Sequence, residues 1–129
     1  MTGPVTDEAG TQPLGQLLIA SSTDGRDRAA AQALVEEETI LARDSVRRLL
    51  VVEREDGPVC HWEGLMGRLY GLGLDDAQRA FLGLVLGMVG IGLHTLPAVE
   101  ELDERRLLIL MRAMPVLACN ERLAVGTRL

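Results

Sequence analysis

Aromatic side chains are nearly absent from this sequence of 129 residues, which contains one tryptophan, one tyrosine and one phenylalanine. A chain of this length can still bury a core, since a domain of about 150 residues buries roughly 70% of its unfolded surface. That core must consist mainly of leucine, valine, isoleucine, alanine and methionine. Abundant leucine with few aromatic residues favours helices over strands. The composition therefore predicts one helical domain.

Lysine is absent, so all thirteen basic residues are arginines, as is typical of a GC-rich genome, and we expect a bacterial source. This absence excludes a catalytic lysine and the phosphate-binding loop G-x-x-x-x-G-K-[ST]. Nineteen acidic residues give a net charge of −6, and the doublets Arg47–Arg48 and Arg105–Arg106 have carboxylates close by in the sequence. We therefore expect neither a nucleic acid nor an anionic membrane surface as a partner.

Cysteine occurs only at Cys60 and Cys119, so at most one disulfide could form. The first ten residues, MTGPVTDEAG, have neither the positive region nor the apolar region of a secretory signal peptide. We therefore expect a cytoplasmic protein in which both cysteines are free thiols.

The start of the chain is small, polar and turn-prone over residues 1–12, which predicts a flexible lead-in. A single helical domain then covers residues 13–129. Its first element is the run LGQLLIAS after Pro13, which fits one or two helical turns or a strand. Of the two, we predict a helix for this run.

The clearest helix covers about residues 26–52, where apolar residues recur at helical spacing. Thr23 or Asp24 can cap its first turn, and Asp27 favours the positive end of the helix dipole. The end of this segment, RRLLVVERE, also fits a strand. A lone strand would have no second strand in the sequence to pair with, so the helix is preferred.

A second helix is predicted over about residues 58–71, because Asp56-Gly57-Pro58 ends one element and a proline fits the first turn of the next. Its apolar residues fall on one stripe, and the glycines of GLG at 71–73 end it. The members of the stripe are Val59, Trp62, Met66, Leu69 and Tyr70.

Two further helices complete the expected fold. Asp75 with Gln78 resembles a capping box and begins a helix over about residues 76–93, which Pro97 limits. The last helix covers about residues 104–114 and ends at Pro115. The sequence thus predicts an all-α fold, a compact bundle of four or five helices around the apolar, glycine-containing helix at its centre.

Residues 80–93, AFLGLVLGMVGIGL, combine a fully apolar character with four glycines that a helix interior would disfavour by about 0.8–1 kcal/mol each. Gly83, Gly87 and Gly90 are spaced by four and three residues and would share one helix face. Such a face lets another backbone approach closely. We expect it to meet a neighbouring helix of the same chain or, as an interface, a second copy in a homodimer.

A membrane span is an alternative for the same run, extended to about residues 80–99. A bilayer core needs about 20 apolar residues, whereas a run of 10 to 14 is more typical of a buried helix. An apolar ligand pocket beside His94 is a further alternative.

Candidate chemistry is confined to few residues. His61 and Glu63 in the run CHWE match half of a zinc-deaminase signature, but the downstream P-C-x-x-C is missing. His94 could act in proton transfer. A metal site could be assembled only from cysteine and histidine at spacings that match no known finger, so we expect no metal or other cofactor. Its candidate ligands are Cys60, His61, His94 and Cys119.

Other patterns have ordinary structural interpretations. The run Glu36-Glu37-Glu38 is read as a solvated helix face, because consecutive side chains point around a helix and share no centre. No serine has a histidine within ten positions, and the E-x-x-H pairs of di-iron bundles are missing.

The leading functional hypothesis is a non-enzymatic interaction or regulatory module that self-associates through apolar helix faces. The alternatives are a membrane-associated protein and a small-molecule binder or enzyme. In the latter an apolar pocket near His94 would use Trp62 and Tyr70 as polar groups.

Overall fold

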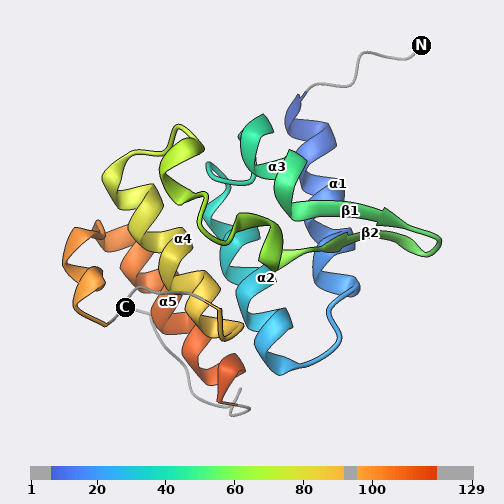
Figure 1. The fold of residues 1–129 in the computed structure, drawn as a ribbon. Coiled ribbons are helices and arrows are strands. Elements are labelled where there is room, and N and C mark those ends of the chain that lie inside the picture. The colour runs from blue at the N-terminus through green and yellow to red at the C-terminus, as the bar shows by residue number, and fades with distance from the viewer. Residues whose placement is uncertain (1–6, 92–95, 119–129) are drawn as a thin grey trace.

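The computed structural model describes residues 7–91 and 96–118. Within these residues the chain is mostly helical, so the expected helical class is confirmed in outline, and a small two-stranded sheet is added to it. Figure 1 shows the helices side by side, with the β1–β2 hairpin projecting from them. The α-helices and strands are α1 (Asp7–Ala20), α2 (Gly25–Glu37), α3 (Asp44–Leu50), β1 (Val51–Arg54), β2 (Gly57–Cys60), α4 (Asp76–Met88) and α5 (Glu104–Leu117). Short 3-10 helices are η1 (Trp62–Leu65), η2 (Leu69–Gly71) and η3 (Leu96–Glu101).

The first helix begins earlier than the sequence predicts. α1 starts at Asp7, inside the expected lead-in, and continues through Pro13. The run LGQLLIAS is therefore helical and not a strand. Leu18 is fully buried, and α1 packs against α2. The expectation for residues 1–6 falls outside the described residues.

The helix expected over residues 26–52 is wrong as a single element, because a turn at 38–43 separates α2 from α3. Its start is as predicted. The Asp24 carboxylate accepts a hydrogen bond from the backbone N–H of Asp27 at 2.9 Å, which satisfies one of the free donors of the first turn.

The break after α2 has a local cause. Glu38 takes a positive φ of 76°, and the Glu37 carboxylate accepts the backbone N–H of Ile40 at 2.8 Å. The turn places Ile40 and Leu41 in the core. Because these apolar residues fall at helical spacing even in the turn, periodicity alone predicts one long helix.

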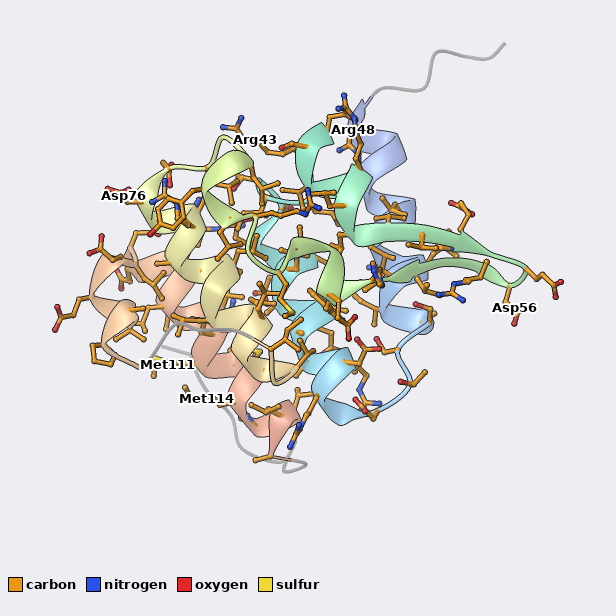
Figure 2. The ribbon with its side chains drawn as sticks, in the orientation of Figure 1. Arg43, Arg48, Asp56, Asp76, Met111 and Met114 are labelled. Atoms are coloured by element: carbon orange, nitrogen blue, oxygen red, sulfur yellow. The ribbon has the colours of Figure 1, made fainter. Side chains whose placement is uncertain are left out.

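The strand interpretation of RRLLVVERE is correct for its second half. β1 pairs antiparallel with β2, with Val51 opposite Cys60 and Arg54 opposite Gly57. The missing partner is thus the next segment of the chain, joined by a two-residue turn at Glu55 and Asp56. Gly57 begins β2 with a φ of 123°, a backbone conformation that favours glycine. Figure 2 labels Asp56 at the tip of this projecting hairpin.

The helix expected over residues 58–71 is also wrong, because β2, η1 and η2 occupy this segment. Its expected apolar stripe is divided: Trp62 is buried, whereas Tyr70 is exposed. A Cβ at Gly64 would lie 2.1 Å from the carbonyl oxygen of Leu49. The backbone of η1 therefore packs directly on α3 at this glycine, where no larger residue would fit.

α4 begins as predicted and ends early. The Asp75 carboxylate accepts the Gln78 backbone N–H at 2.8 Å, and the Gln78 side chain accepts the Asp75 N–H at 3.0 Å, so the capping box is confirmed. The helix ends at Met88, short of the expected 76–93. Gly90, with a φ of 86°, lies beyond its end.

α5 begins after Asp103, as predicted, and extends past the expected end of the helix over 104–114. Pro115 lies inside its last turn. The proline is buried, so its packing offsets the hydrogen bond that its missing N–H cannot form.

The packing centre is α2 and not the glycine-containing helix, which corrects the expected bundle. α2 packs against α1, α4 and α5. Small side chains on several of its faces allow these three helices to approach. Its fully buried alanines are Ala29, Ala30, Ala31 and Ala33.

Among the described residues, no helix is both long enough and apolar enough to cross a bilayer. The span considered over residues 80–99 instead contains most of α4 and the first residues of η3, with residues between them that lie outside the described part.

Candidate functional site

The CHWE run does not form a compact catalytic group. Cys60 ends β2, His61 precedes η1, and Glu63 lies within η1. The His61 Nδ1 and Glu63 Oε1 atoms are 3.8 Å apart, and both side chains are largely exposed. An exposed pair of this kind contributes little free energy and has no fixed orientation for proton transfer.

Cys60 is a half-buried free thiol. Burial, with a smaller contribution from the charge of Asp27, raises its pKa to about 12. The thiol is thus protonated at neutral pH, which opposes nucleophilic or metal-binding chemistry. No group of three or more metal-ligating side chains occurs among the described residues, and His94 and Cys119 lie outside them.

Trp62 connects η1 to α2. Its indole N–H donates a hydrogen bond to the Asp27 carboxylate, which also accepts the backbone N–H of Thr23 at 3.3 Å. The tryptophan is buried, so this contact holds the segment after β2 against the first turn of α2. Trp62 thus has a structural partner and does not present a polar group to an apolar pocket.

The surface hollows separate the two aromatic residues that were expected in one pocket. Trp62 lines a hollow of about 220 Å³ between the start of α2, η1 and the end of α4. Tyr70 lines another of about 290 Å³ and stacks over Arg79, with 4.5 Å from guanidinium carbon to ring centroid. The expected pocket beside His94 falls outside the described residues.

A buried polar network joins α2, α4 and α5 around Glu37, whose exposed fraction is 0%. The carboxylate accepts hydrogen bonds from the Thr39 hydroxyl and from the Arg106 guanidinium, with Nε at 2.9 Å. Gln78 donates to the Thr39 hydroxyl at 3.0 Å. The interpretation of residues 36–38 as a solvated face is therefore wrong for Glu37. Charge pattern alone does not reveal this, since its neighbours in the run are partly or largely exposed.

The arginine doublet of α5 caps the end of α2. Arg105 donates to the backbone carbonyls of Glu37 at 3.1 Å and Glu36 at 2.9 Å, and Arg112 pairs with the Glu36 carboxylate. Guanidinium groups satisfy the free carbonyls of a helix C-terminus and favour its negative dipole. The groups of this network are paired with one another, so the network stabilises the packing of α5 against the end of α2.

The expected glycine interface is not assembled as one helix face. Gly83 is buried in α4, Gly87 is exposed, and Gly90 follows the helix with a left-handed backbone. A Cβ at Gly87 would have no atom within 4 Å. The spacing of four and three therefore does not give the three glycines a common groove.

Three large exposed apolar residues lie together on α5, along a stripe that we define as Leu107, Met111 and Met114, whereas Leu17, Met66 and Tyr70 are exposed on other segments. Their exposed fractions are 36%, 39% and 50%. The spacing of four and three places them on one face of the helix. Figure 2 labels both methionines on α5. The opposite face is buried in the core through Ile109, Leu110 and Ala113.

Comparison with known proteins adds no relative. No protein-family model, no curated protein and no solved structure matches the chain.

Proposed function

We propose that this protein is a non-enzymatic helical interaction module that binds a helix of another polypeptide through the α5 stripe. The observation that carries the proposal is the row of three large exposed apolar side chains on one face of a helix that is buried in the core through Ile109, Leu110 and Ala113. Aligned apolar anchors at this spacing are what a helix-in-groove contact uses.

The rest of α5 supports this assignment. Ile109 and Leu110 are buried, and Arg105, Arg106 and Arg112 are held by the end of α2. The helix is thus fixed in place by one face and one flank, while the α5 stripe on the other flank stays accessible. A surface presented on a rigid element loses little conformational entropy when it binds.

Self-association, expected from the sequence, is one form of such binding. We propose the α5 stripe as its surface in place of the three glycines, because Gly90 lies outside α4 and Gly83 is buried. A second copy would contribute the same helix face, as in an isologous dimer.

The test is a binding and self-association measurement on two matched variants. Met114→Glu places a charge in the α5 stripe, and Leu17→Glu places one on α1 at the same exposed fraction of 50%. Sedimentation velocity reports self-association, and fluorescence anisotropy reports binding of a labelled amphipathic helix with an uncharged polar face.

We expect Met114→Glu to weaken the observed association about tenfold or more, because a charge must be desolvated at the contact, while Leu17→Glu leaves it unchanged. The proposal fails if the wild-type chain neither self-associates nor binds the helix. It also fails if the two variants have equal effects.

A further inference from the structure

We infer that the helix bound by the α5 stripe is basic: an amphipathic helix with an apolar face and arginine or lysine residues beside it. This inference rests on the proposed function and adds the chemistry of the partner. It is carried by the charges that surround the α5 stripe.

Three exposed carboxylates stand at the N-terminal end of the stripe. Glu100 and Glu101 end η3, two residues before α5 begins at Glu104, and Glu104 is three residues before Leu107 on the helix surface. None of these three carboxylates forms an ion pair or side-chain hydrogen bond within the described part of the chain. They are free to attract cationic side chains of a ligand.

The arginines of α5 do not cancel this charge. Arg106 lies between the Glu37 and Asp103 carboxylates, with Nη2 to Oε2 at 2.8 Å and Nη1 to Oδ1 at 2.9 Å. Arg105 and Arg112 are turned toward the end of α2, where Glu36 accepts from both. The arginines of α5 are therefore paired with acceptors of the same chain. The net charge of the whole chain is −6.

The apolar members of the stripe also suit a helical ligand. Leu107 to Met114 spans about 10 Å at 1.5 Å per residue, which is two turns of a partner helix. Unbranched methionine side chains at Met111 and Met114 can repack against different apolar residues. A second copy of the chain would bring the same carboxylates and the same negative net charge, so charge complementarity favours a basic ligand over self-association.

The experiment compares three labelled helical peptides of about 18 residues that share one leucine-rich face. Their polar faces carry arginine, glutamine or glutamate, and fluorescence anisotropy gives Kd for each with the full-length chain. We expect the basic peptide to bind about tenfold more tightly than the neutral one, and the acidic peptide more weakly than either. Raising the salt concentration from about 0.05 to about 0.5 M should reduce this preference, because exposed charges are screened.

A matched pair of triple variants locates the effect. Neutralising the stripe carboxylates should reduce the affinity for the basic peptide to nearly that for the neutral one, whereas the same charge change on the hairpin should change it less than about twofold. The stripe variant is Glu100→Gln, Glu101→Gln and Glu104→Gln, and the hairpin variant is Glu53→Gln, Glu55→Gln and Asp56→Asn.

Failure of the basic ligand can be distinguished from failure of the interaction module. Equal Kd values for basic and neutral peptides, or equal effects of the two triple variants, would overturn the basic ligand while leaving the interaction module standing. Binding of a second copy in preference to every peptide would also overturn it. If no peptide binds and the chain remains monomeric, the proposed function itself fails.

Discussion

Three consecutive glutamates at the end of α2 have three different environments. Glu37 is fully buried, while the side chains of Glu36 and Glu38 are 46% and 69% exposed. Glu37 is stable as a buried charge only because Arg106, Thr39 and a backbone N–H satisfy it. The sequence does not distinguish the three, since their environments depend on where α2 ends and where α5 returns to it.

We predict that Glu37→Gln lowers the free energy of unfolding by about 3 kcal/mol, because it leaves the Arg106 guanidinium without its buried counter-charge. Urea unfolding followed by circular dichroism measures this. Glu38→Gln is the matched control. The Glu38 Oε1 atom lies 3.9 Å from an Arg105 nitrogen on the surface, and loss of this ion pair should lower the free energy of unfolding by less than about 0.5 kcal/mol. Equal costs for the two variants would mean that Glu37 is not buried with Arg106.

Asp103 contributes to the free energy of unfolding in a way that depends on pH in the acidic range. Its hydrogen bond from Arg106 lowers the pKa of the carboxyl group below its ordinary value. A lowered folded-state pKa contributes stability above the unfolded-state value, near pH 4, and this contribution is lost as the pH falls through the folded-state pKa. Asp103→Asn should therefore flatten the loss of stability between about pH 5 and 3. Urea unfolding at several pH values measures the slope, and identical slopes for variant and wild type would contradict this role.

At the scale of elements, the N-terminal caps of α2 and α4 could be predicted best. Asp24 and the Asp75–Gln78 capping box begin α2 and α4 as the sequence indicates, because capping is a local interaction between residues three apart. The break at Glu38 and the pairing of β1 with β2 could not be found by apolar periodicity, which continues across both. Asp56-Gly57 was the available signal for the hairpin.

Two glycines, one in η1 and one in α4, should respond oppositely to substitution by alanine. A Cβ at Gly87, in α4, would meet no atom within 4 Å, so Gly87→Ala should raise the free energy of unfolding by about 0.5–1 kcal/mol. Gly64→Ala should lower it by about 3 kcal/mol, because its Cβ would lie 2.1 Å from the Leu49 carbonyl oxygen. Thermal unfolding of both variants tests this. A destabilising Gly87→Ala would indicate that its face of α4 is closely packed after all.

At the scale of the whole molecule, composition predicted a mostly helical fold but not its centre. The apolar glycine-containing segment had the hydrophobicity of a central helix, yet α2, with its buried alanines, holds that position. Small side chains allow close packing of three neighbours, and this depends on chain topology. The α5 stripe could likewise not be chosen from the sequence, because the run LLILM does not reveal which of its residues face the core.

The most direct test of the α5 stripe as a binding surface is a methyl NMR titration of methionine-labelled, full-length protein with the basic amphipathic peptide. If the α5 stripe is the binding surface, the signals of Met111 and Met114 will shift together with one Kd. Met66, which is 53% exposed against 50% for Met114, should keep its position because it lies in the segment between η1 and η2. Equal shifts at Met66 and Met114, or an unchanged spectrum at saturating peptide, would contradict the assignment of the stripe as the site where a partner helix binds.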